Sequence, residues 1–254
     1  MNEALRGLAA DLKAATLFAT RLPLPHAAAI GGSDIARATW ALPAIGALIG
    51  LLSALAYWVP CYFRAPPFVC AALAVAASLI ATGGLHEDGL ADTCDGLGGG
   101  TRERKLEIMR DSRVGTYGAC ALALSLLLRI GALASLPGPL PAAFALIAAH
   151  AGARAPLPLF LALVPPARTD GLAADAGRPP AMRAAIAVII GAVLLLIGLG
   201  VTRSFAAFLM LAAAFAAVRW LTQRELGGQT GDVAGSLEQV SEIVVLLAAT
   251  ASRV

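Results

Sequence analysis

The chain has 254 residues and a formal net charge of +3, and 59% of its residues are hydrophobic while only 14% are charged. Soluble domains contain about 45–50% apolar residues, so this composition excludes an ordinary soluble protein and favours an integral membrane protein. The sequence has no basic stripe with interleaved aromatic residues, so we expect no nucleic-acid partner. The four cysteines form no CxxC pair and fit best as small apolar side chains.

The first segment, residues 1–20, mixes charged residues with an apolar pattern and does not resemble a signal peptide. Its apolar residues recur at helical spacing: Leu5, Leu8, Leu12, Ala15 and Phe18. This spacing predicts an amphipathic helix that lies along the membrane interface. A proline-broken turn is expected at residues 20–26.

Seven apolar runs follow, most of them close to the ~20 residues that span a bilayer. They cover residues 39–59, 67–85, 114–136, 140–164, 184–201, 204–221 and 237–251. The alternating strands of a membrane barrel are missing from the sequence. We therefore predict an all-α, polytopic transmembrane helical bundle of about seven spans, which forms a single domain over residues 1–254.

Most of the lysines and arginines fall on one side of this predicted topology. That side carries the N-terminal segment and the polar loops after the second, fourth and sixth spans. The positive-inside rule assigns the lysine- and arginine-rich side to the cytoplasm. Every polar motif discussed below would then face the same compartment.

The most distinctive motif is residues 83–100, G-G-L-H-E-D-G-L-A-D-T-C-D-G-L-G-G-G. Asp88, Asp92 and Asp95 are spaced by four and three, so they share one face of a helix, whereas Glu87 points elsewhere. Crowded carboxylates repel one another, and their hard oxygen atoms suit Mg²⁺ or Mn²⁺. A solvated acidic loop is the alternative, but ionisable groups at a bilayer edge are costly and usually functional.

A charged segment, residues 101–118, comes next. Asp111 could be a fourth metal ligand beside Asp92 and Asp95, and Gly115 permits close backbone approach. Three cations could neutralise a diphosphate through charge-assisted contacts: Lys105, Arg110 and Arg113. A salt-bridged helix next to the membrane is the competing interpretation.

The third motif, residues 226–242, places Thr230 and Asp232 among glycines and ends in Glu238 and Glu242 on the last span. These groups could bind a second metal or orient a hydroxyl nucleophile, and the three carboxylates are candidate proton acceptors. The loop lacks the GK[ST] ending of a Walker loop. An ordinary turn with Ser236 as the helix cap remains the alternative.

Three further ionisable residues fall inside predicted spans, namely Arg129, His150 and Arg154. His150 and Arg154 share a helix face. A buried arginine needs an acidic residue or a phosphate as its partner, so a structural ion pair and a substrate contact both stay open.

Together these motifs resemble the cobalamin synthase family, whose members are adenosylcobinamide-GDP ribazoletransferases. The resemblance rests on F-A-T-R-L-P-L-P at 18–25, G-L-H-E-D-G-L-A-D-T-C-D-G at 84–96, I-M-R-D-S-R-V-G-T-Y-G at 108–118 and G-Q-T-G-D-V-A-G at 228–235. These pieces stand in family order over essentially the whole chain. The family usually has lysine where Arg110 stands.

The resemblance implies a late step of cobalamin (vitamin B12) biosynthesis at the bacterial inner membrane. The family transfers the adenosylcobinamide-phosphate moiety from adenosylcobinamide-GDP to α-ribazole, or to its 5′-phosphate, and releases GMP with Mg²⁺ as the cofactor. On this basis we expect the catalytic acids to lie among Asp92, Asp95, Asp232, Glu238 and Glu242. Membrane lipid would surround the chain, and a homo-oligomer is possible.

Two other functions stay open. Asp92-x-x-Asp95-Gly96 followed by Glu107-x-x-x-Asp111 gives a looser likeness to CDP-alcohol phosphotransferases, although their Ala-Arg after the glycine is absent. A transporter would also place carboxylates in a membrane, but it would more typically show inverted repeats with acids at mid-span.

Overall fold

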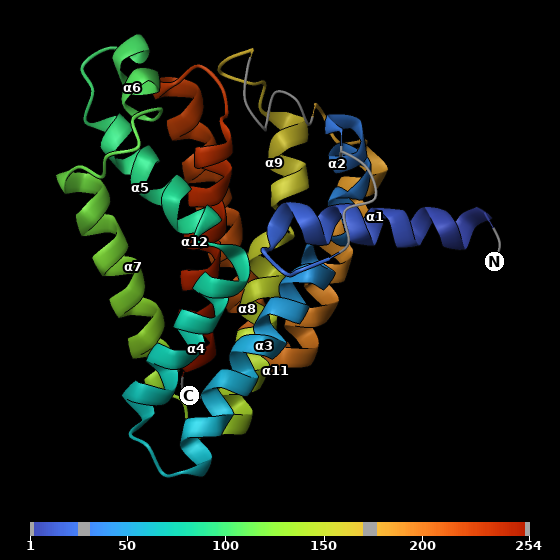
Figure 1. Ribbon diagram of the computed structural model, residues 1–254, viewed down its shortest axis with the longest axis vertical. Coiled ribbons are helices and arrows are strands. Elements are labelled where there is room, and N and C mark those ends of the chain that lie inside the picture. The colour runs from blue at the N-terminus through green and yellow to red at the C-terminus, as the bar shows by residue number, and fades with distance from the viewer. Residues whose placement is uncertain (1–2, 25–30, 170–176, 252–254) are drawn as a thin grey trace.

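The computed structural model describes residues 3–24, 31–169 and 177–251, and these residues form a bundle of α-helices (Figure 1). The helices are α1 (Glu3–Ala19), α2 (Gly32–Ala38), α3 (Leu42–Tyr62), α4 (Pro67–Thr82), α5 (Leu85–Leu97), α6 (Arg102–Ile108), α7 (Thr116–Ala134), α8 (Pro139–Arg154), α9 (Leu157–Leu163), α11 (Ala181–Glu225) and α12 (Gly231–Thr250). The all-α class is therefore confirmed. The turn expected at 20–26 lies partly outside the described residues.

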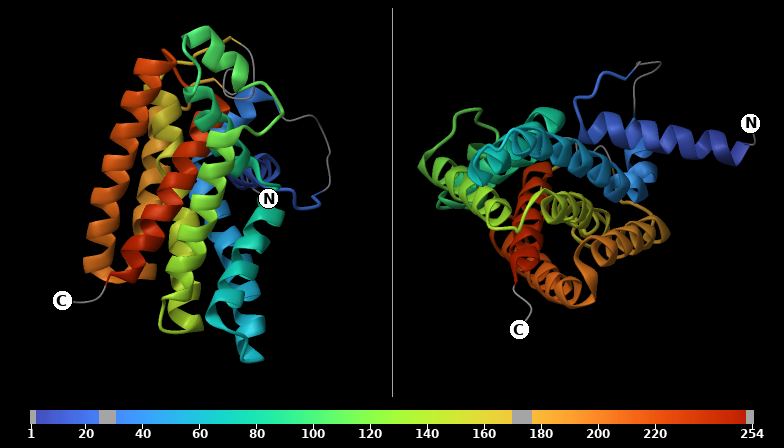
Figure 2. Two further views of the ribbon diagram at one scale, coloured as in Figure 1. Left: turned by 90° about the vertical axis from the view of Figure 1, so that its left-hand side faces the viewer. Right: turned by 90° about the horizontal axis from the view of Figure 1, so that it is seen from below.

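Five of the described helices are long and apolar enough to cross a membrane, or up to six spans if α4 and α5 count as one broken span. The longest, α11, is interrupted at Gly200, where φ is 73° and ψ is 173°. Across this turn the Ser204 hydroxyl donates to the Leu195 carbonyl at 2.8 Å. Figure 2 shows the two arms of α11 as neighbouring rods, which correspond to the runs predicted at 184–201 and 204–221.

The acidic motif of α5 follows a sharp change of direction. Gly83 and Gly84 have φ values of 69° and 70°, a left-handed conformation that glycine adopts without strain. After them α5 leaves α4 at 90°. The run predicted at 140–164 is likewise divided into α8 and α9, because Pro156 lacks the N–H that a continuous helix needs.

Helix α1 lies crosswise to the bundle, as Figure 1 shows, and exposes Leu5, Leu8 and Leu12. The buried carboxylate of Asp11 fixes it in place. Asp11 accepts hydrogen bonds from Arg37 Nε at 2.7 Å, Trp40 Nε1 at 2.9 Å and Arg183 Nη1 at 3.2 Å. The predicted N-terminal amphipathic helix is present, with apolar side chains on its exposed face, as an interfacial helix requires.

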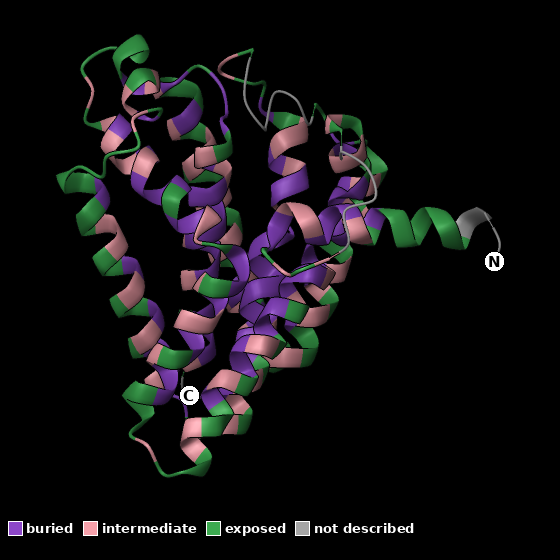
Figure 3. Ribbon diagram, viewed as in Figure 1, coloured by how far each residue is buried: buried purple, intermediate pink, exposed green. Residues whose placement is uncertain are grey.

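Buried residues gather at mid-height of the bundle, where α3, α8 and α12 lie together (Figure 3). One core cluster consists mainly of alanine and leucine from α3, α4, α7, α8, α11 and α12. Small side chains let helices approach closely, which is how membrane helices gain packing energy without a strong hydrophobic driving force. This rigid core supports the polar site at one end of the bundle.

Candidate functional site

The site is built where α5 crosses the first turn of α12. A Cβ atom on Gly89 would lie only 2.7 Å from the Asp232 carbonyl oxygen, so the two backbones touch here. The Ser236 hydroxyl donates to the Gly89 carbonyl at 3.2 Å and ties the helices together. This crossing brings Asp232 to the acidic face of α5, although Asp92 on that face precedes it by 140 positions in the sequence.

Four carboxylates lie around this crossing, and we call them the acidic cluster: Asp88, Asp92, Asp95 and Asp232. Asp92 interacts electrostatically with the other three and with the guanidinium of Arg168. Asp88 is exposed, while Asp92 and Asp232 are half-buried. The predicted grouping of Asp88, Asp92 and Asp95 on one helix is therefore present, and the third motif contributes a further acid to it.

The residue types of the acidic cluster suit a divalent cation, although among the described residues the three ligand atoms that lie within 4.8 Å of one another belong to His150, Glu238 and Glu242. Its four carboxylates carry more negative charge than the single guanidinium of Arg168 offsets, and neighbouring like charges disfavour the ionised state. All four offer hard oxygen atoms, the ligands that Mg²⁺ prefers. The magnesium prediction itself stays a prediction.

Asp95 also has a role in the fold. Its carboxylate accepts the backbone N–H groups of Gly115 at 2.7 Å and Gly118 at 2.9 Å, and so caps the N-terminus of α7. A Cβ atom on either glycine would lie within 2.5 Å of an Asp95 carboxylate oxygen. The lack of a side chain at Gly115 thus makes room for the carboxylate of Asp95. The predicted contact of Gly115 with a substrate phosphate stays a prediction.

The structure places Asp111 against Arg113, whose Nη2 atom lies 2.6 Å from Oδ2 of Asp111. The hydrogen bonds that Arg113 donates lower the pKa of this partly exposed carboxyl to about 2. Lys105 forms an ion pair with Glu225, and Arg110 is exposed. The proposed roles of these residues in metal or phosphate binding remain untested predictions.

Helix α12 begins at Gly231, which is earlier than the run predicted at 237–251. Its N-cap is Thr230, whose hydroxyl oxygen accepts the Val233 N–H at 3.3 Å and also contacts Asp232 Oδ2 at 3.2 Å. The alternative of Ser236 as the helix cap was therefore wrong. Thr230 orients the first turn of α12 and its acid, Asp232.

Deeper in the bundle lies a second polar group, the buried ion network, which consists of Glu87, Arg129, His150, Arg154, Glu238 and Glu242. Arg154 Nη1 lies 2.6 Å from Glu238 Oε1, and His150 Nδ1 lies 3.3 Å from Glu242 Oε2. Arg129 Nη1 lies 3.0 Å from Glu87 Oε1 and 3.4 Å from Glu242 Oε1. The network joins α5, α7, α8 and α12.

This network supplies the partners that the intramembrane arginines were expected to need. Glu238 and Glu242 are almost fully buried, and Glu87, expected to point away, is a buried partner of Arg129. Gln239, which the sequence analysis did not single out, donates to Glu87 at 3.2 Å and to Glu238 at 3.1 Å. Buried charges are tolerated when they are paired and hydrogen-bonded.

The ligand atoms of His150, Glu238 and Glu242 lie within 4.8 Å of one another, as a metal site would require. Both glutamates, however, already contact guanidinium groups, which supply positive charge to the same carboxylates. Their predicted catalytic roles and a second metal stay predictions. Arg168, beside Asp232, was also missed as a site residue, because a loop arginine among many has no sequence signal.

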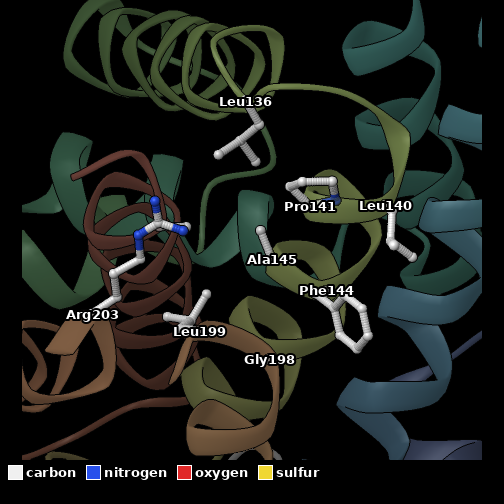
Figure 4. A pocket seen from close by; sticks show the side chains of 9 residues that line it. Leu136, Leu140, Pro141, Phe144, Ala145, Gly198, Leu199 and Arg203 are labelled. Carbon is white, nitrogen blue, oxygen red and sulfur yellow. The ribbon is translucent and has the colours of Figure 1, made fainter. Parts of the chain in front are cut away.

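An apolar pocket of about 220 Å³ opens between α8, α11 and α12 (Figure 4). Apart from Arg203, the described side chains that line it are apolar. Its α12 residue, Ala249, lies 17 positions beyond Asp232, or roughly 25 Å along a helix that rises 1.5 Å per residue. The pocket is therefore remote from the acidic cluster.

Comparison with known proteins connects this arrangement to one family. A family described as Cobalamin-5-phosphate synthase matches residues 11–250. An adenosylcobinamide-GDP ribazoletransferase of Bradyrhizobium diazoefficiens is 51% identical over 251 residues, which cover 98% of this chain and 96% of the relative. The enzyme of the same name from Mesorhizobium japonicum is 49% identical, over 94% of this chain and 92% of its own.

A third adenosylcobinamide-GDP ribazoletransferase, from Azorhizobium caulinodans, is 48% identical over 94% of each chain. No solved structure matches. The family match spans both the acidic motif of α5 and the start of α12, the two segments that form the acidic cluster. The chain belongs to the cobalamin-5-phosphate synthase family.

Proposed function

We propose that this protein transfers the adenosylcobinamide-phosphate moiety from adenosylcobinamide-GDP to α-ribazole or α-ribazole 5′-phosphate. The products are adenosylcobalamin, or its 5′-phosphate, and GMP. The acidic cluster carries this proposal, because it gathers four carboxylates from two segments on a polar end of an apolar bundle. The names of the full-length relatives supply the substrates.

In this reaction a ribose hydroxyl of α-ribazole attacks the phosphorus on the cobinamide side of the diphosphate. A new O–P bond forms, the bond from that phosphorus to the bridging oxygen breaks, and GMP leaves with the bridging oxygen. The hydroxyl proton passes to a carboxylate. Such transfers depend on positioning and charge stabilisation more than on covalent chemistry by the protein.

Asp88 and Asp92 would hold Mg²⁺ together with the lone pairs of Asp95 that its two backbone bonds leave unused. When bound there, the ion would neutralise the diphosphate and the charge that develops on the leaving GMP. Asp111 is directed to Arg113, and the fourth carboxylate of the acidic cluster is Asp232.

Among the three proton acceptors predicted from sequence, Asp232 lies in the acidic cluster, whereas Glu238 and Glu242 are buried in ion pairs. A proton acceptor has to come within hydrogen-bond reach of the attacking hydroxyl. We assign this role to Asp232. We further propose that the protein lies in the bacterial inner membrane with the acidic cluster facing the cytoplasm, as the distribution of lysine and arginine favours.

The test is GMP release by the purified full-length protein from adenosylcobinamide-GDP and α-ribazole with Mg²⁺, repeated with EDTA. We expect EDTA and Asp92→Asn each to abolish turnover, while Glu103→Gln, which removes an exposed carboxylate near the same end, leaves it unchanged. Size-exclusion behaviour of Asp92→Asn in detergent should match that of the wild type. Near-normal GMP release by Asp92→Asn would refute the assignment.

A further inference from the structure

Arg168 stands on a loop whose backbone is held firmly beside the acidic cluster. The Ala167 N–H donates to the Gln229 carbonyl at 2.8 Å, and the Gln229 N–H donates to the Pro165 carbonyl at 2.8 Å. A Cβ atom on Gly228 would lie 2.5 Å from the Pro165 carbonyl oxygen, so the glycine is what allows this contact. The loop that precedes Arg168 is thereby fixed to the loop that precedes α12.

A second arginine secures the same two loops from α6. Arg102 Nε donates to the Leu226 carbonyl at 2.7 Å, and its Nη2 donates to the Ala167 carbonyl at 3.0 Å. Three segments that are distant in sequence are thus joined through backbone carbonyls. The position of Arg168 follows from this rigid support.

The guanidinium of Arg168 is only partly used by the protein. Its Nη2 atom lies 3.3 Å from Asp232 Oδ2, and the side chain is 19% exposed. Its Nη1 atom is buried and has no hydrogen-bond partner among the described residues. A buried donor without a partner is costly, so this N–H group is expected to meet a ligand or water when the protein works.

We propose that Arg168 binds the diphosphate of the nucleotide-activated substrate, with one edge of its guanidinium on Asp232 and the free Nη1 on a phosphate oxygen. The planar fork of arginine suits this double contact, and hydrogen bonds between ionised groups are the strong ones. Arg168 also offsets part of the negative charge of Asp92 and Asp232, which would otherwise repel a diphosphate.

This inference rests on the proposed function, and it adds a phosphate-binding residue that the sequence motifs did not identify. A purely structural Asp232–Arg168 ion pair would affect every ligand of the site alike. A phosphate-binding Arg168 affects only ligands that carry phosphate. The two roles are therefore separated by comparing guanosine with GDP.

The experiment measures binding of GDP and guanosine directly, by calorimetry on the full-length protein in detergent with Mg²⁺, and also measures the inhibition of GMP release by each of them. The variants are Arg168→Gln, Arg168→Lys and, as a matched control, Arg104→Gln, which removes an exposed arginine paired with Glu107. We expect Arg168→Gln to weaken the binding of GDP by ~10-fold or more and the binding of guanosine by less than about twofold. The GDP affinity of Arg168→Lys should lie between those of the wild type and Arg168→Gln, because lysine keeps the positive charge but lacks the planar, two-pronged guanidinium.

Unchanged GDP binding by Arg168→Gln, or equal weakening of GDP and guanosine, would overturn the inference. If Arg168→Gln does not fold, Arg168→Lys provides the test. An Arg168→Lys variant that prefers GDP over guanosine as strongly as the wild type does would also overturn the inference. Failure of the proposed function is a separate result. It would appear as wild-type protein that binds GDP but releases no GMP from adenosylcobinamide-GDP.

Discussion

The carboxylate of Asp95 has two roles to reconcile, a predicted one in metal binding and an observed one in capping a helix. It was expected to bind metal, and it also caps α7 by accepting the N–H groups of Gly115 and Gly118. A negative group at a helix N-terminus stabilises the helix by satisfying free N–H groups and by complementing the helix dipole. Asp92, three residues earlier, contributes charge to the same cluster and has no hydrogen bond to the backbone of α7 among the described residues.

This difference predicts different consequences for Asp95→Asn and Asp92→Asn. In Asp95→Asn the amide NH₂ would face one of two backbone N–H donors, so we expect the free energy of unfolding to fall by about 1–2 kcal/mol, as for a lost helix cap. Asp92→Asn should lose activity without this loss of stability. Thermal unfolding in detergent measures both, and equal melting temperatures for the two variants would contradict the capping role of Asp95.

The buried ion network illustrates how charge is tolerated inside an apolar bundle. Arg129 and Arg154 are about 1% exposed, and each lies within 3.4 Å of a carboxylate oxygen from another helix. Removing one member would strand a buried charge, which is far more costly than replacing a whole pair by apolar side chains. We therefore read Glu238 and Glu242 as residues that position α12 against α7 and α8.

At the scale of elements, the crossing of α5 and α12 determines the site. Gly89 touches the Asp232 backbone, and Gly235 faces His86 and Gly89, with Cβ contacts at 3.3–3.4 Å. Each helix thus presents a glycine where the other approaches. Without this contact, Asp232 would lie farther from Asp88 and Asp92, and the acidic cluster would lose its fourth member.

We predict that Gly89→Ala separates the two helices and abolishes or strongly reduces GMP release. The new Cβ would lie 2.7 Å from a backbone oxygen that cannot move by itself, and overpacking of this kind costs about 1–3 kcal/mol of stability. Gly131→Ala on α7 is the matched control, because no atom lies within 4 Å of its added Cβ. Activity and melting temperature of both variants in detergent provide the measurement, and full activity in Gly89→Ala would contradict the importance of the crossing.

Local sequence patterns predicted some elements well and others poorly. The apolar runs located α3, α4 and α7 to within a few residues, because hydrophobic length is a strong signal. The start of α12 was missed, since G-D-V-A-G-S resembles a loop until Gly235 is seen to face α5. The run predicted at 140–164 matches one candidate span, Pro139–Leu163, although the interruption of its helix at Pro156 was not predicted.

The site was only partly predictable for the same reason. Asp88, Asp92 and Asp95 could be grouped because their spacing lies within one helix. Asp232 joins them, and Glu242 joins Arg129, through packing between helices that no local pattern encodes. The need of an intramembrane arginine for an acidic partner was foreseeable, but the identity of that partner was not.

At the scale of the whole molecule, polarity changes along the bundle axis. The loops joined by Arg102 lie at one end, near the acidic cluster (Figure 1). The buried ion network lies deeper, since Glu238 follows Asp232 by six residues, or ~9 Å of helix. The pocket lined by Phe144 and Leu199 lies toward the end where α12 finishes. The acidic cluster thus lies at one end of the bundle, the buried ion network in its interior and a mainly apolar pocket toward the other end.

This arrangement gives a prediction about orientation in the membrane. Ser112 and Ser135 are both exposed and flank α7 at its two ends, with Ser112 on the side of the acidic cluster. Because lysine and arginine are concentrated on that side, we expect it to face the cytoplasm. In a variant whose four native cysteines are replaced by alanine, a membrane-impermeant maleimide should label Ser135→Cys in intact spheroplasts. It should label Ser112→Cys only after the membrane is opened.

The two serine-to-cysteine variants control for each other, because both replace an exposed serine next to the same helix and differ only in the end on which they stand. Labelling after detergent treatment establishes that both cysteines can react. The reverse pattern in intact spheroplasts would place the acidic cluster outside the cytoplasm, where a GDP-activated substrate made in the cytosol could not reach Asp92. The orientation and the proposed reaction would then be incompatible, and the charge bias would need a different explanation.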